Sequence, residues 1–142
     1  MCDVAQHRID RIAVHGLERR RDACTTDSCD AMRGCVHVQV SGDAALTCVF
    51  TNGLAPAACS RVPAAVTRRF EHAQRLTERA LATSKAAARR RALRRAAAQL
   101  AQAQRQVQRM VAHEKLTSDC GQALDVTLQD AAQRIQRELS AS

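Results

Sequence analysis

Apolar residues recur at helical spacing throughout the C-terminal part of the chain, and this periodicity restricts the fold more than any other feature. Neighbours within each of three stripes lie three or four residues apart, as they do on one face of an α-helix. The stripes consist of Val62, Val66, Phe70, Ala73, Leu76 and Ala80; of Leu93, Ala96, Leu100, Ala103, Val107 and Met110; and of Cys120, Leu124, Leu128, Ala131, Ile135 and Leu139. The spacing predicts helices over about 62–82, 85–113 and 118–140.

These helices predict a mainly α fold in which residues 60–142 form a three-helix, up-down-up bundle. The chain has no Trp, no Tyr and two Phe, so its core must consist of Ala, Leu, Val and Ile. The break at "ATSKAAA" contains neither Gly nor Pro, which leaves a single rod over 63–113 as the alternative. Two helices are preferred, because folding back buries a stripe that a rod would leave uncovered. Ser84, and either Thr117 or Ser118, can cap the second and third helices.

Cys59 and Cys120 stand at the starts of the first and third helices. These helices run parallel in an up-down-up bundle, so both starts lie at the same end. We therefore predict a disulfide between the two cysteines. It would close a loop of about sixty residues and contribute roughly 3–4 kcal/mol in the chain-entropy model. The alternative is two independent thiols, with Cys120 acting as a small core residue.

The chain before residue 60 has a different composition, since it holds six of the seven cysteines and four of the five glycines. We expect an irregular, disulfide-rich segment over residues 22–59. A zinc site built from Cys24, Cys29, Cys35 and His37 is the less favoured alternative, because the C-x2-C pairs of zinc modules are missing. A calcium loop built from the nearby aspartates is not expected, because no Gly-centred loop with a terminal Glu is present.

The stretch "DACTTDSCDAMRGCVH" resembles the Dictyostelium repeat, a cysteine-rich repeat of slime-mould extracellular-matrix proteins that also occurs in arrays in bacterial proteins predicted to be secreted. The residues that match the pattern are Cys24, Thr25, Asp27, Cys29, Asp30, Gly34, Cys35 and Val36. The helical remainder is similar to the C-terminal tails of such bacterial proteins. The resemblance implies a disulfide-bonded extracellular or cell-surface protein. The pairing of Cys24, Cys29, Cys35 and Cys48 cannot be deduced from spacing.

The lead-in to this stretch departs from the repeat. Glu18 and the three arginines after it stand where the repeat has its first cysteine and Asp-Asp-Gly. The N-terminus also carries charged residues where a signal peptide has an apolar run. We therefore expect residues 1–21 to be a non-native lead-in and the chain to be the end of a longer secreted protein. In the alternative, Cys2 replaces the missing cysteine.

The chain is strongly basic, with a formal net charge of +8 and a pI near 9.8. A candidate anion-binding patch is formed by Arg89, Arg90, Arg91, Arg94 and Arg95, and no acidic residue lies between Lys85 and Met110. A solvated helix face is the preferred interpretation of this run, and anion binding is the alternative. No apolar run approaches the eighteen or so residues that a membrane helix needs.

Catalytic groups do not gather in any pattern that indicates an enzyme. The five histidines are scattered, and no phosphate-binding glycine loop or zinc-protease motif is present. We expect a non-enzymatic secreted protein with a structural or adhesive role and no cofactor. An acidic polysaccharide or a cell-surface component is its candidate partner. The alternative is an intracellular basic helical protein that binds nucleic acid non-specifically and holds zinc at Cys24, Cys29, Cys35 and His37.

Overall fold

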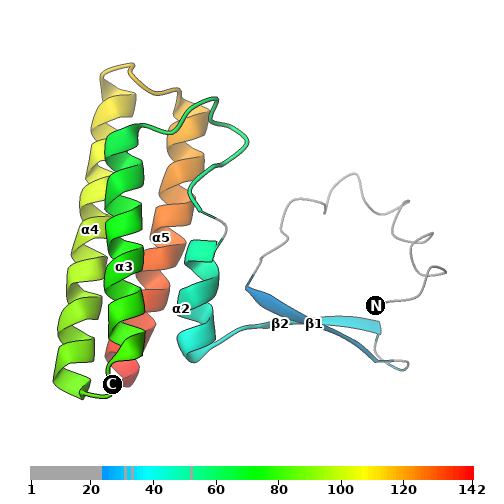
Figure 1. The fold of residues 1–142 in the computed structure, drawn as a ribbon. Helices are drawn as coiled ribbons and strands as arrows, with labels where there is room; N and C mark the ends of the chain where they lie inside the picture. The colour runs from blue at the N-terminus through cyan, green and yellow to red at the C-terminus, as the bar shows by residue number, and fades with distance from the viewer. Residues whose placement is uncertain (1–23, 31, 33, 52) are drawn as a thin grey trace. The chain divides into compact units, whose positions relative to one another are not determined.

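The computed structural model describes residues 24–30, 32, 34–51 and 53–142, and the chain divides into two compact units, 1–40 and 41–142. The elements in chain order are β1 (Thr25–Asp30), β2 (Gly34–Gln39), α2 (Gly42–Thr51), α3 (Ala64–Ala82), α4 (Ala86–Ala112) and α5 (Ser118–Ala141) (Figure 1). The fold is mainly helical, as expected. The hypothesis about residues 1–21, and Cys2 with it, concerns positions outside the described residues.

The cysteine-rich segment contains a two-stranded antiparallel hairpin where an irregular chain was expected. β1 pairs with β2 so that Cys29 lies opposite Cys35 in the register and Asp30 lies opposite Gly34. Val40 N donates to Cys24 O at 2.8 Å and extends the pairing by one step. Gly34 has φ +74°, a left-handed conformation that glycine adopts without a steric penalty as the chain enters β2. The β-branched residues at alternate positions of β2 favour an extended chain.

The long helices of the second unit run up-down-up, with α4 packed against both α3 and α5 (Figure 1). The single-rod alternative is excluded, because Thr83 is extended (φ −102°, ψ 135°) and ends α3 before α4 begins. Lys85, not Ser84, is the N-cap of α4, and no side chain caps that helix. Thr117 caps α5, where its Oγ1 accepts a hydrogen bond from Cys120 N at 3.3 Å.

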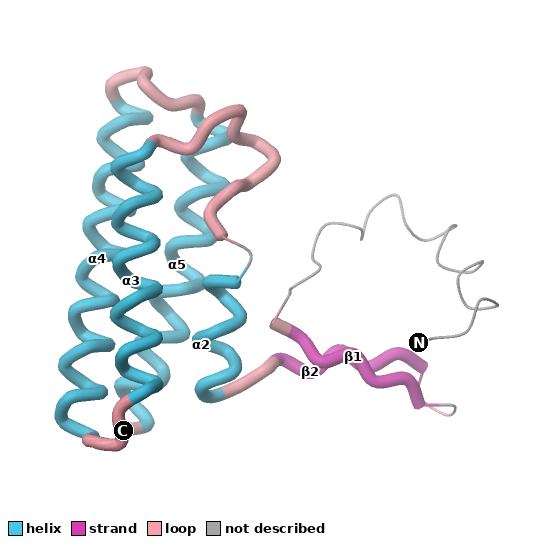
Figure 2. Tube along the Cα trace, in the orientation of Figure 1, coloured by secondary structure: helices cyan, strands magenta, loops and turns pink. Residues whose placement is uncertain are grey.

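A fourth helix, α2, corrects the prediction of a three-helix bundle. It packs against α3 and α5, each of which also packs against α4 (Figure 2). Its buried residues are Ala45, Leu46, Val49 and Phe50. The Phe50 ring lies 5.0 Å from the Phe70 ring of α3, centroid to centroid. Because α2 packs against both α3 and α5, its apolar side chains cover core residues of these two helices.

Alanines make up much of the core between the long helices. Ala73, Ala80, Ala96, Ala103 and Ala131 are fully buried, alongside larger residues such as Leu100 and Ile135. A buried alanine lets two helix axes approach closely, but it removes less apolar area from water than leucine does. The core of the bundle therefore removes less apolar area from water than a leucine-rich core of the same length would. Each large buried side chain accordingly contributes a larger share of the free energy of folding.

Gly121 marks the closest approach between α5 and the end of α4. A Cβ at this position would overlap the side chain of Val111, which is β-branched and stiff. We expect Gly121→Ala to lower the free energy of unfolding, because overpacking of about 1–3 kcal/mol exceeds the gain in helix propensity of about 1 kcal/mol. Urea denaturation measures the effect.

The second substitution Val111→Ala should restore most of the loss caused by Gly121→Ala, because it removes the overlapping methyl groups. Gln122→Ala, at an exposed position one residue further along α5, is the matched control and should change little. Equal stabilities for Gly121→Ala and Gln122→Ala would contradict the close approach.

Candidate functional site

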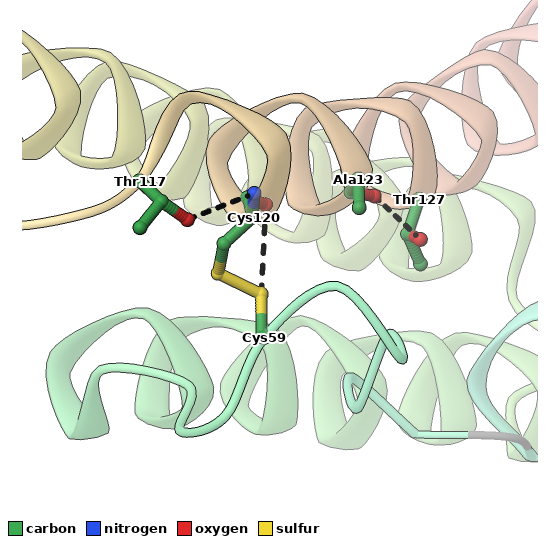
Figure 3. The surroundings of a disulfide bond; sticks show 5 residues. All are labelled: Cys59, Thr117, Cys120, Ala123 and Thr127. Atoms are coloured by element: carbon green, nitrogen blue, oxygen red, sulfur yellow. Dashed lines mark hydrogen bonds between the residues drawn. A yellow bond between two sulfur atoms is a disulfide. The ribbon is translucent and has the colours of Figure 1, made fainter.

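A disulfide joins Cys59, in the segment before α3, to Cys120 in the first turn of α5 (Figure 3). The two Cα atoms are 4.7 Å apart and the cysteines are separated by 61 residues in sequence. Because α3 and α5 run in the same direction, both begin at the same end of the bundle. The bridge therefore fixes the start of α5 to the chain that enters α3.

The environment of this disulfide holds it rigidly. Cys120 is buried at 3% exposure, and its backbone N–H is bound by the Thr117 hydroxyl. Cys59 Sγ lies 3.5 Å from the carbonyl oxygen of Cys120. That approach is a contact and not a hydrogen bond, because a disulfide sulfur carries no hydrogen. A reductant can reach the bridge only from the Cys59 side, which is partly exposed.

Two further cysteines, Cys24 and Cys48, are disulfide-bonded. The less favoured alternative was a zinc site with Cys24 as one of its ligands. A sulfur atom in a disulfide is not the thiolate that zinc requires. Within the part of the chain that the structure describes, no group of three or more His, Cys, Asp or Glu residues is arranged to hold a metal ion. The register places the Cα atoms of Cys29 and Cys35 opposite each other in the hairpin.

Of the five arginines in the candidate anion-binding patch, one forms ion pairs with acidic side chains and four do not. Arg89 Nη2 lies 2.5 Å from Asp43 Oδ1 and 3.4 Å from Glu138 Oε2, so it links α4 to α2 and α5. The hydrogen bond to Asp43 is the main reason why the pKa of Arg89 is raised above its ordinary value, and partial burial opposes the rise. Arg89 therefore connects three helices, and its charge is already paired with two carboxylates.

The other four residues form what we call the arginine face: Arg90, Arg91, Arg94 and Arg95. All four are exposed, and they line a shallow surface depression together with Ala87 and Ala98. None of them has an ion pair within the described part of the chain. Like charges one helical turn apart destabilise a helix by roughly 0.2–0.5 kcal/mol per pair.

A polar clamp between α3 and α4 was missed by the sequence analysis. Arg69 donates hydrogen bonds to the side-chain oxygens of three glutamines: Gln99 at 3.3 Å, Gln106 at 3.4 Å, and Gln102. The signal in the sequence was their spacing of three and four residues along the flank of the second stripe. The guanidinium uses Nε and Nη1 for these neutral acceptors, so Arg69 connects α3 to α4.

None of the helices that the structure describes is long and apolar enough to cross a membrane.

The family model of the Dictyostelium (slime mold) repeat matches residues 21–40, a range that includes the whole of β1 and β2. The resemblance found in the sequence is thereby confirmed for this stretch. Comparison with curated proteins finds no match to the chain, and neither does comparison with solved structures. The helical unit, residues 41–142, lies entirely beyond the matched range.

Proposed function

We propose that this chain is a non-enzymatic, secreted module with a structural or adhesive role, in which disulfides stabilise a small helical domain. The observation that carries the proposal is the Cys59–Cys120 disulfide. Protein disulfides persist in oxidising surroundings such as the extracellular space, and cytosolic reductants remove them. The similarity of residues 21–40 to a cysteine-rich repeat supports the same setting.

The state of the cysteines also supports a non-enzymatic role. Cys24, Cys48, Cys59 and Cys120 are all disulfide-bonded, so none of these four supplies a thiolate nucleophile. His72 and His113 are exposed on the surface of the helical unit. A general base works best when a partner orients it, and among the described residues no side-chain hydrogen bond or ion pair orients the imidazole of either histidine.

Binding of nucleic acid inside the cell is the competing function. Single-stranded nucleic acid is usually held by exposed aromatic rings on which bases stack. The sequence has no Trp or Tyr, and its two phenylalanines, Phe50 and Phe70, are buried against each other. No phenylalanine, tyrosine or tryptophan ring is therefore exposed for a base to stack on, and this supports the extracellular proposal.

Cell fractionation combined with peptide mapping tests the proposal. An antibody against the helical unit should detect the protein in the medium or the extracellular matrix of the organism that makes it. Without reduction, trypsin should yield a disulfide-linked species that contains both peptide 34–61 and peptide 116–134, and tandem mass spectrometry should assign the link to Cys59 and Cys120, since peptide 34–61 also holds Cys35 and Cys48. Protein confined to the cytosol, with seven alkylatable thiols and bound zinc, would overturn the proposal in favour of the intracellular alternative.

A further inference from the structure

We propose that the arginine face of α4 binds an acidic polysaccharide, a linear chain that carries carboxylate or sulfate groups. The inference rests on the proposed adhesive function and gives it a partner. It starts from the clustering of four exposed arginines within two turns of one helix. Arg89 and Arg134 are paired with acidic residues and Arg69 is held by glutamines. The arginine face has no such partners among the described residues, and its members lie next to one another, whereas the other exposed arginines are scattered over the helices.

The geometry of the arginine face suits a repeating anion. Arg90 and Arg94 lie one turn apart on α4, as do Arg91 and Arg95, which puts the members of each pair about 6 Å apart along the helix axis. Each guanidinium presents several N–H donors in a plane that matches a carboxylate or a sulfate with two parallel hydrogen bonds. Two such rows side by side can contact successive charged groups of one extended chain.

The shape of the surface argues for a polymer and against a small anion. The depression at the arginine face is shallow, and its remaining lining consists of alanine side chains. A small anion would stay largely hydrated there and would exchange its water for few protein contacts. A polyanion bridges several guanidinium groups at once and releases counterions from each contact, so its affinity increases with every arginine it reaches.

Other polyanions fit the observations less well. An anionic membrane surface usually takes up an amphipathic helix through apolar side chains beside the cations. The large exposed apolar residues of the described chain are Met32, Val36, Val38 and Val126, and none of them lies on α4. Nucleic acid lacks a stacking partner, as argued above. A secreted protein meets acidic glycans instead, in the compartment where its disulfides persist.

Titration of the full-length oxidised protein tests the inference, with heparin as the sulfated probe and a polyuronate as the carboxylated probe. The test variant replaces all four residues of the arginine face by glutamine, which has a similar helix propensity. The matched control replaces Arg68, Arg75, Arg109 and Arg137 by glutamine, so that the same charge is removed from exposed positions elsewhere. At 0.15 M salt we expect the test variant to bind on the order of tenfold or more weakly, and the control about as tightly as the parent.

A third variant has lysine at all four positions of the arginine face. It keeps the positive charge but lacks the planar guanidinium group. It should bind at least one polysaccharide more weakly than the parent and more tightly than the glutamine variant. This series keeps the test valid if the glutamine variant folds poorly, because lysine retains both charge and helix propensity. Circular dichroism of each variant checks the fold.

Each contrary result overturns a defined part of the inference. Equal weakening in the test and control variants would show that net charge alone drives binding. Tighter binding of double-stranded DNA or of anionic vesicles than of either polysaccharide, lost in the same variant, would reassign the arginine face to that partner. Extracellular protein that fails to bind polysaccharide removes this partner and leaves the proposed function standing. Cytosolic protein that binds polysaccharide in the test tube removes the proposed function instead.

Discussion

Replacement of Cys59 by serine together with Cys120 by alanine is expected to lower the free energy of unfolding by about 4 kcal/mol, judged from the entropy of closing a loop of this size. The cysteines are 61 residues apart, and the enclosed loop contains all of α3 and α4. Without the bridge the unfolded chain gains the conformational freedom of that loop, while the folded bundle keeps its packing. Alanine is chosen at position 120 because that site is buried.

Urea denaturation of the oxidised protein and of the double variant gives the difference directly. Thr117→Ala is the matched control, since it removes the cap that binds Cys120 N and leaves the disulfide intact. Loss of such a cap costs about 1 kcal/mol. A double variant no less stable than Thr117→Ala would contradict the view that the disulfide is a principal constraint on this domain.

Hydrogen exchange in the same double variant should show which part of the domain the Cys59–Cys120 disulfide stabilises most. The disulfide holds the first turn of α5, so hydrogen exchange in the double variant should accelerate most at the start of that helix. The middle of α4, around buried Leu100, exchanges only when the whole bundle unfolds, so its protection should fall by no more than the loss in global stability. Uniform acceleration along all helices would indicate that the bridge stabilises the domain only as a whole.

The long helices were open to prediction because each carries an apolar stripe over four or more turns. Periodicity of that length leaves little room for another structure, and α3, α4 and α5 lie where the stripes placed helices. The proximity of Cys59 and Cys120 follows from the same reasoning, since parallel helices begin at one end of a bundle. Both inferences depend on patterns within the chain and need no knowledge of packing.

The helix α2 was missed because its local signal is short and ambiguous. It spans ten residues and contains Cys48, Thr47 and Val49, which suit a disulfide loop or a strand as well as a helix. What stabilises it as a helix is the packing of its apolar side chains against α3 and α5. Packing of this kind is decided by residues distant in sequence, and no local pattern reports it.

The roles of the arginines on α4 could likewise not be predicted from the local sequence. Arg89 belongs to the same run as the arginine face and looks identical to its neighbours in sequence. Its partners, Asp43 and Glu138, lie 46 residues before it and 49 residues after it. The division between a structural arginine and four exposed ones therefore appears only once the helices are assembled. That division is what turns a basic run into a defined candidate surface.

Phe70→Ala is expected to have the other large effect, a loss of about 3–5 kcal/mol in the free energy of unfolding. Phe70 is 2% exposed and packs its ring against Phe50 of α2. The sequence contains no other aromatic side chain that could fill the space, and Ala73 one turn away is too small to do so. Phe70→Leu is the control, because it keeps most of the volume and should cost less than about 1.5 kcal/mol.

A double-mutant cycle with Phe50→Ala decides whether α2 is an integral part of the bundle. If α2 folds together with the long helices, Phe50→Ala alone should be strongly destabilising. The two substitutions should then show a coupling of about 0.5–1.5 kcal/mol, the range for aromatic pairs. Urea denaturation followed by circular dichroism should show one transition in every variant. If Phe50→Ala has little effect while Phe70→Ala remains severe, the three long helices fold without α2. The helix α2 would then pack on a three-helix core that folds without it.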